Sequence, residues 1–257
     1  MATTVSDGGR DASRYRSAQI GLTRLLVRDI RGLRRLIIPS RLRQSMPDWL
    51  AAMQAVIDQY SFASAALGAE FYDAQRDAAG VPGVFTASVT DPPPEGKTEA
   101  SLRWATKDVW EREPDVATDA QAQPLAVRLE QAAKKAEAVA QKLVADTGRS
   151  TVTGAVREDA QATAWARTAA LGACAFCKLI ASRGAVFKQD TARFEAHDGC
   201  HCGAIPIFRG QRFELSPQAA EWARLYQEYA AGHSGSQLAR FRRALAEHDP
   251  NPLPGAF

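Results

Sequence analysis

The chain has 257 residues, of which 46% are hydrophobic and 24% are charged, so it can bury a substantial core and is not a disordered protein. Its formal net charge is +3, but the segment from Arg10 to Arg43 holds ten arginines against two aspartates and carries +8, which leaves −5 for the rest. This asymmetry favours an acidic partner, either nucleic acid or an acidic protein surface. The first residues lack the apolar segment of a secretory signal, so we expect a protein made in the cytoplasm.

The first predicted helix runs from about Ser13 to Ile38 and is amphipathic and basic. Its leucines and isoleucines recur at helical spacing on one stripe, and its arginines lie on another. Such an arginine stripe is usually a solvated face, but ten arginines exceed what solvation requires. We therefore predict that it binds double-stranded DNA or an acidic protein groove. A membrane partner is disfavoured because the apolar stripe lacks Trp and Phe anchors. The predicted binding residues are Arg24, Arg28, Arg31, Arg34 and Arg35.

A second helix is expected from the Ser45-Met-Pro47-Asp48 segment to Ala79, with Gly80 as its stop. Residues 80–100 are rich in turn-forming residues and are predicted to be a loop or linker. A short helix should follow around Thr98 to Trp110.

Pro124 opens a further predicted helix, which the Asp146-Thr-Gly148 segment should close. Ser150 to Leu171 is then predicted to be a separate alanine-rich helix that leads directly to the first cysteine pair. Beyond that pair, residues 185–188 and 204–208 are expected to form two strands that pair with each other.

Two closing helices are predicted at Pro217 to Tyr229 and Gln237 to His248. The expected fold class is therefore α+β and predominantly helical: a helical N-terminal region, then a small zinc-stabilised module with a short β-hairpin or sheet and closing helices. We place the helical region with its basic first helix at residues 1–115. The second domain, with the cysteine and histidine cluster at 174–202, covers residues 116–257.

All four cysteines lie within 29 residues, in two short-spaced groups joined by a loop. Two such groups can close around one tetrahedral metal ion, because each presents neighbouring ligands and the loop lets them meet. In a reducing compartment, clustered cysteines are more often metal-bound thiolates than disulfides. Zinc is the predicted ion. The candidate ligands are Cys174, Cys177, His197, Cys200 and Cys202.

Only four of these ligands are needed, and the sequence does not choose between His197 and Cys202 for the fourth position. Either set would fill the coordination sphere and leave no place for an activated water, so the site is predicted to be structural. His201 is expected to point outward. Two disulfides are an alternative, as is a redox-active Cys174-x-x-Cys177 pair. The redox alternative is disfavoured because the pair follows a predicted long helix rather than a strand.

Catalysis finds little support in the sequence, and we do not expect an enzyme. There is no phosphate-binding glycine loop and no nucleophile elbow. A nuclease with a histidine base would need a metal with open positions, yet the best placed histidine, His197, is itself a candidate zinc ligand. A zinc-containing DNA-binding protein or nuclease remains the alternative function.

Around the cysteines the chain resembles the Mu F-like minor head proteins of tailed phages, in the versions encoded by phages of actinobacteria. The resemblance covers roughly residues 150–210. It rests on a cysteine pair, a Ser-Arg-Gly corner before an aromatic residue, a closing His-x-x-Cys-x-Cys segment and a proline-containing strand: Cys174, Cys177, Ser182, Arg183, Gly184, Phe187, His197, Cys200, Cys202 and Pro206.

The resemblance implies a minor capsid protein present in few copies in the virion, inside the phage head near the portal, and assembled in the cytoplasm of the bacterial host. It implies the portal protein and the capsid interior as partners and, in some relatives, a part in DNA packaging or ejection. The commonest loop of the family has Pro-Asn before the cysteine and Arg between the cysteines. This chain has Asp198-Gly199 and His201 instead, which keeps the ligand frame but not that arginine.

Overall fold

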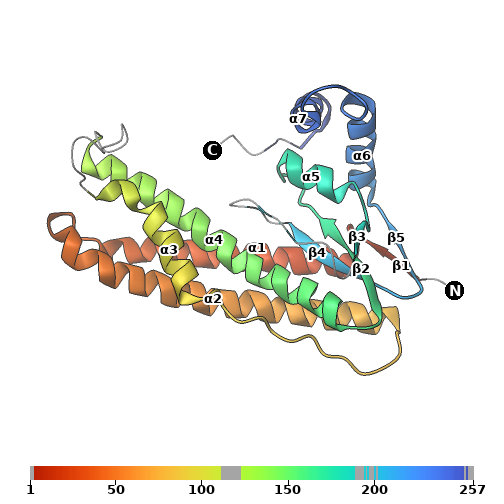
Figure 1. Ribbon diagram of the computed structural model, residues 1–257, viewed down its shortest axis with the longest axis horizontal. Coiled ribbons are helices and arrows are strands. Elements are labelled where there is room, and N and C mark those ends of the chain that lie inside the picture. The colour runs from red at the N-terminus through yellow and green to blue at the C-terminus, as the bar shows by residue number, and fades with distance from the viewer. Residues whose placement is uncertain are drawn as a thin grey trace.

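The computed structural model describes residues 3–110, 123–188, 194, 196, 200, 202–251 and 253. Its body is a bundle of long helices that lie side by side, with a small sheet module at one end (Figure 1). The longest helix has 38 residues and spans about 57 Å at 1.5 Å per residue. The three long helices are α1 (Arg10–Leu33), α2 (Leu42–Ala79) and α4 (Leu125–Glu158).

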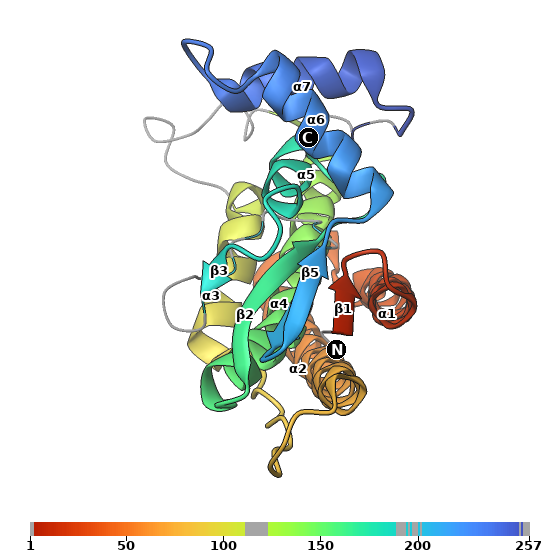
Figure 2. The ribbon, with the colours of Figure 1, turned by 90° about the vertical axis from the view of Figure 1, so that its right-hand side faces the viewer.

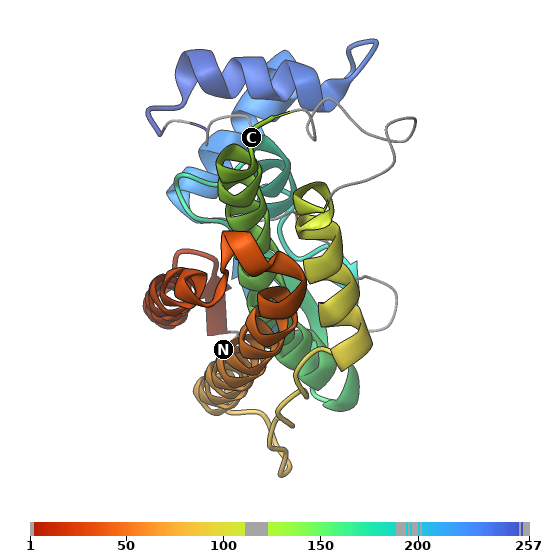
Figure 3. The ribbon, with the colours of Figure 1, turned by 90° about the vertical axis from the view of Figure 1, so that its left-hand side faces the viewer.

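Short helical segments connect and cover the bundle. Two 3₁₀ turns, η1 (Arg34–Leu36) and η2 (Pro39–Arg41), join α1 to α2 at the end far from the sheet (Figure 3). Helix α3 (Glu95–Ala105) and the turn η3 (Lys107–Val109) pack against α4. Among the described helices, none is both long and apolar enough to cross a membrane.

The sheet module contains two small sheets, and three helices lie over it (Figure 2). One sheet is antiparallel with the order β3-β2-β4, and the other is a parallel pair of β1 and β5. The strands are β1 (Thr3–Ser6), β2 (Ala162–Thr168), β3 (Phe187–Lys188), β4 (Gly203–Phe208) and β5 (Gln211–Glu214). The helices are α5 (Ala175–Ala181), α6 (Pro217–Tyr229) and α7 (Gln237–His248).

The N-terminal strand is fixed to the C-terminal half of the chain. Val5 of β1 lies opposite Phe213 of β5, and the buried carboxylate of Asp7 accepts hydrogen bonds from the backbone N–H of Ser216 at 2.7 Å and from its hydroxyl at 2.8 Å. The Ser216 hydroxyl in turn caps α6 by accepting from the N–H of Ala219. These contacts hold the start of α1 against the sheet module.

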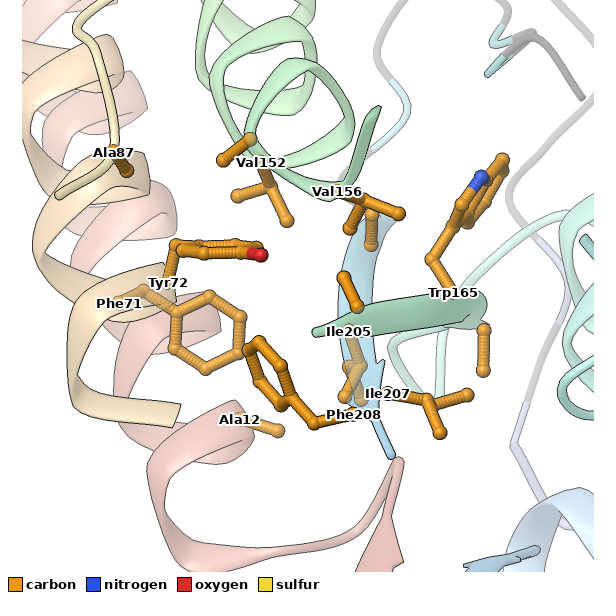
Figure 4. Close-up of a cluster of buried hydrophobic side chains, with 14 of the residues drawn as sticks. Ala12, Phe71, Tyr72, Ala87, Val152, Val156, Trp165, Ile205, Ile207 and Phe208 are labelled. Atoms are coloured by element: carbon orange, nitrogen blue, oxygen red, sulfur yellow. The ribbon is translucent and has the colours of Figure 1, made fainter. Parts of the chain in front are cut away.

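One hydrophobic core joins the long helices to the sheet (Figure 4). Aromatic rings from α1, α2 and β4 meet there, and the rings of Tyr15 and Phe71 stack with centroids 4.4 Å apart. A second core lies within the bundle and contains side chains of α1, α2, α3 and α4. Side chains in the first core include Phe71, Tyr72, Val152, Val156, Ile205 and Phe208.

The predicted helix stop at Gly148 is wrong, because α4 continues through it to Glu158. Gly148 instead lies where α4 contacts α2. A Cβ at Gly148 would lie 2.5 Å from the hydroxyl of Ser64, and a Cβ at Gly68 of α2 would lie 2.8 Å from the carbonyl oxygen of Gly148. Glycines at both positions therefore let α2 and α4 approach closely.

The predicted helix from Ser150 to Leu171 is also wrong beyond Glu158. Asp159 ends α4, its side chain accepts the N–H of Gln161, and the chain turns into strand β2. Trp165 lies in this strand and stacks on Phe187 with ring centroids 4.2 Å apart. Because β2 lies between β3 and β4, the two strands that were expected to pair with each other do not.

Other boundaries agree more closely with the sequence. Helix α2 ends at Ala79, and Gly80 has a φ of 62° as a left-handed cap. Both closing helices have the predicted bounds, and the α+β, predominantly helical class is confirmed. The first helix ends earlier than predicted, at Leu33, and α3 begins inside the predicted loop, at Glu95. The domain boundary at 115/116 lies outside the described residues and stays a prediction.

We expect Gly148→Ala to destabilise the protein by about 1–3 kcal/mol, because the new methyl group overpacks the contact with Ser64. The matched control is Gly154→Ala in the same helix, where nothing lies within 4 Å of an added Cβ. The control should gain about 0.5–1 kcal/mol from helix propensity. Urea unfolding followed by circular dichroism measures the free energy of unfolding of both variants. Equal values for the two variants would contradict the close contact.

Candidate metal centre

The first cysteine pair follows strand β2 and opens a helix. Cys174 is the N-cap of α5, and its sulfur accepts a hydrogen bond from the backbone N–H of Cys177 at 3.4 Å. The sequence-based argument against a redox pair, that it follows a long helix, is therefore wrong. What distinguishes this pair from an isolated redox dithiol is that Cys177 faces two further cysteines.

Three buried sulfurs converge at one point. The Sγ atoms of Cys177, Cys200 and Cys202 all lie within 4.8 Å of one another, and those of Cys177 and Cys200 are 3.3 Å apart. The latter separation exceeds the roughly 2.0 Å of a disulfide bond and approaches the spacing in a tetrahedral zinc–thiolate site, where Zn–S is about 2.3 Å. All four cysteines are free thiols. The donor set therefore fits a thiophilic metal ion, and these three cysteines could hold one.

Two candidate metal ligands remain, Cys174 and His197. Cys174 is only partly buried and lies outside the group of three, but its side chain contacts Cys177. His197 lies outside the described residues, as does His201, so both predictions for these histidines stay predictions.

Two buried arginines next to the sulfurs were missed by the sequence analysis. Arg149 of α4 donates from Nε to the carbonyl oxygen of Cys202 at 2.7 Å and from Nη2 to that of Cys200. Its Nη1 donates to Asp146 at 2.7 Å. Arg149 thus fixes the Cys200–Cys202 segment, the second cysteine arm, to the helical bundle.

Arg167 of β2 is the second of these arginines. Its Nη1 lies 3.9 Å from the sulfur of Cys177, and its guanidinium lies over the ring of Phe194 at 3.9 Å from the centroid. Neither arginine belongs to a recognisable motif, and a charged residue in an isolated sequence segment is normally assigned to the surface. Only the fold brings both to the cysteines.

The buried thiols shift one another's pKa values in opposite directions. The pKa of Cys200 is lowered because Cys177 and Cys202 donate hydrogen bonds to its sulfur, and the positive charge of Arg149 adds to the effect. The pKa of Cys177 is raised by its contacts with Cys174 and Cys200. A cluster of this kind can carry thiolate, which is the form that binds metals.

A buried ion pair fixes α5 to the end of the chain. The ammonium group of Lys178 lies 2.7 Å from the carboxylate of Asp249, and both side chains are fully buried. Asp249 also accepts from the indole of Trp222 at 2.8 Å and from the backbone N–H of Asn251 at 2.9 Å. Burial alone would raise the pKa of Asp249, but these hydrogen bonds, led by Lys178, lower it below its usual value.

The five arginines of the predicted binding stripe are exposed, but only some of them form ion pairs. Arg31 makes a two-fold contact with Glu137 of α4 at 3.1 Å, and Arg28 pairs with Asp29 at 3.0 Å. Within the described part of the chain, Arg24, Arg34 and Arg35 make no ion pair. Of the predicted stripe, these three therefore keep their full charge for a partner.

We predict that Asp249→Asn destabilises the protein by about 3–5 kcal/mol, because it leaves the charge of Lys178 buried without its counter-ion. Since the folded-state pKa of Asp249 is lowered, its contribution is present at neutral pH and is lost as the pH falls through the acidic range. Thermal unfolding at pH 7 and pH 3 tests this, with a smaller difference expected between the variant and the wild type at pH 3.

The matched control is Glu221→Gln, which removes the exposed partner of Arg224 on the neighbouring α6. An exposed pair contributes little, so this variant should unfold like the wild type. If Asp249→Asn also unfolds like the wild type, the Lys178–Asp249 pair does not anchor α5.

Comparison with known proteins gives one match. Residues 8–229 match the family model described as VG15 protein, which covers both the helical bundle and the cysteine cluster. Searches of curated proteins and of solved structures gave no match to this chain. The matched family is a phage-associated family of viral gene proteins, which supports a phage protein. This chain therefore belongs to the VG15 family.

Proposed function

We propose that this chain is a non-enzymatic minor head protein of a tailed phage, of the Mu F-like kind, that docks on the portal protein inside the head. The observation that carries the proposal is the match of residues 8–229 to a phage family together with the sequence features of the cysteine module. In the Ser-Arg-Gly corner, Gly184 has a φ of 68° and lies three residues before Phe187, which begins strand β3 and stacks on Trp165.

The docking surface in this proposal is the arginine-rich end of the helical hairpin. The turn between α1 and α2 lies at the end of the bundle opposite the sheet module (Figure 1). Exposed arginines at 34, 35, 41 and 43 surround this turn, and residues 30–47 contain no acidic side chain. A concentrated positive end attracts an acidic surface, such as an acidic face of the portal protein or the packaged DNA.

The cysteine module in this proposal holds one zinc ion with a structural role. Zinc would link the N-terminus of α5 to the arm that enters β4, and so would add to the stability that the hydrophobic core of this module provides. The support is the convergence of three buried sulfurs and the clamp of Arg149 on the second arm.

For the zinc ion, we expect Cys177→Ser to lower the metal content of the purified, reduced protein from one zinc per chain to nearly none. Residues 174–208 should then lose protection against hydrogen exchange, while α1 and α2 keep theirs, because the bundle has its own core. Elemental analysis and hydrogen exchange with mass spectrometry measure the two effects. The control His201→Gln should keep the zinc, and wild-type protein without any metal would refute the zinc assignment.

For the docking surface, we expect the triple variant Arg34→Gln, Arg35→Gln, Arg41→Gln to lose capture of the portal protein at moderate salt. The control removes three exposed arginines elsewhere, at Arg212, Arg242 and Arg243, and so has the same net charge. Pull-down with the portal protein of the same phage and a gel-shift assay with duplex DNA are run in parallel.

Each outcome of these assays decides something. Loss of portal capture in the first triple variant alone supports the proposed surface and partner. Loss of DNA binding alone identifies DNA as the partner of the same surface. If both triple variants bind like the wild type, the arginines form an ordinary solvated face and not a docking surface. Metal-dependent DNA cleavage that is lost in His197→Gln would contradict a non-enzymatic role.

A further inference from the structure

A pocket opens at the arginine-rich end of the bundle, where the start of α2 and the start of α4 lie at the same end of the molecule (Figure 1). Its volume is about 790 Å³, within the range of about 300–1,000 Å³ that is typical of ligand sites. Residues 39–44, which form η2 and the first residues of α2, line one side. The end of η3, Trp110 and the first turn of α4 line the other side.

Three arginines line this pocket, Arg41, Arg43 and Arg128, and no acidic side chain of the described residues lines it with them. Arg41 and Arg43 are exposed. Within the described part of the chain, none of the three arginines forms an ion pair. Charges of one sign in a concave site attract a counter-charge more strongly than the same charges on a flat surface, because the protein walls focus the field. The pocket therefore favours an anionic ligand.

Arg128 is held at the wall of the pocket by the backbone of η3. Its Nη1 donates to the carbonyl oxygens of Asp108 at 3.2 Å and of Val109 at 3.3 Å. The carboxylate of Asp108 is bound by Lys135 at 2.8 Å. Nε of Arg128 is buried, and no described group accepts a hydrogen bond from it. Because a guanidinium has five N–H donors and a buried unpaired donor is costly, a ligand that accepts hydrogen bonds from Arg128 gains stability.

The pocket also has apolar walls, and these distinguish between the possible anions. Leu42, Trp110 and Leu125 are partly buried, and Val109 is buried. A free phosphate ion would use only the arginines. A DNA duplex is a stiff rod with a persistence length of about 150 base pairs, so it lies on a surface and does not enter a pocket of this size. A flexible protein segment enters and uses both kinds of wall, and arginine and aromatic residues are typical of the centres of protein interfaces.

We propose that this pocket binds a flexible acidic segment of a protein partner, with carboxylates against the three arginines and apolar side chains against the leucines and Trp110. The inference rests on the docking surface of the proposed function. It specifies the chemistry of the partner there: an acidic and apolar peptide segment, and not the backbone of DNA.

The ligand class is tested with a capped hexapeptide of alternating glutamate and leucine that carries a fluorescein label, added to the full-length protein. We expect binding in fluorescence anisotropy, and no binding of the same peptide with glutamine in place of glutamate. The double variant Arg41→Gln, Arg43→Gln should bind the acidic peptide about tenfold more weakly, because it loses charge-assisted contacts. The matched control Arg242→Gln, Arg243→Gln loses the same charge on α7 and should bind like the wild type.

The position of the bound peptide is tested through Trp110. We expect the unlabelled acidic peptide to change the tryptophan fluorescence of the wild type, and Trp110→Phe to lose this change while it still binds the labelled peptide. A change that persists in Trp110→Phe would place the peptide elsewhere and overturn the proposal. Arg128→Gln should also weaken binding, and circular dichroism shows whether this variant is folded.

Two other occupants would each overturn the proposal. A DNA duplex that binds the wild type but not the Arg41→Gln, Arg43→Gln variant, with no binding of the peptide, would make DNA the ligand of this pocket. The sequence after Trp110 contains four acidic residues. If the peptide binds only after their replacement by amides, the pocket is filled by the chain itself; these residues are Glu111, Glu113, Asp115 and Asp119.

The failure of this inference differs from the failure of the proposed function. Peptide binding that depends on Arg41 and Arg43 supports the pocket, even where portal capture is the same in the wild type and in Arg34→Gln, Arg35→Gln, Arg41→Gln, which would refute the portal as partner. Portal capture that this triple variant loses, without any binding of the acidic peptide, would refute the pocket and leave the docking surface.

Discussion

Helices α2 and α4 touch through two glycines, and much of the molecule depends on that contact. Gly68 and Gly148 bring the two backbones so close that a single added methyl group would meet Ser64. The residue after this contact is Arg149, which reaches across to the carbonyl oxygens of Cys200 and Cys202. The position of α4 therefore also sets where the second cysteine arm lies. A change in helix packing would move a ligand arm, even though no cysteine belongs to the bundle.

The sheet module is small, and it is held together by polar contacts as well as by its core. Lys178 and Asp249 form a fully buried pair between α5 and the end of the chain. Arg76 of α2 and Asp159, which ends α4, form another buried pair at 2.9 Å. Buried pairs of this kind are costly to break because each leaves a charge without a partner. They fix the orientation of α5 and β2, the two elements that carry Cys177 and Arg167.

The sequence predicts those parts of the fold that local chemistry determines. The end of α2 at Gly80 and both closing helices follow from a glycine cap and from Ser caps, which act within a few residues. The error at Gly148 arises because a glycine at a helix crossing and a glycine at a helix end look the same in a sequence. The two arginines beside the cysteines are invisible for a similar reason. Arg149 donates to carbonyl groups 51 and 53 residues away, and Arg167 reaches Cys177 only because α5 packs on β2. Cysteine spacing, by contrast, is a local pattern, and it predicted the cluster that the fold brings together.

The parallel pairing of β1 with β5 also constrains the order of folding. Val5 meets Phe213, and Asp7 meets Ser216, across more than 200 residues of chain. Because a chain emerges from the ribosome with its N-terminus first, β1 has to wait until β5, about 200 residues later, has been synthesised before it finds its partner. Helix α1 follows β1 directly, so its N-terminal end becomes anchored to the sheet only late, after α2 and α4 are available to pack along the rest of it. The β1–β5 pair thus forms, and the position of the arginine-bearing helix becomes final, only after the chain has been made as far as Ser216.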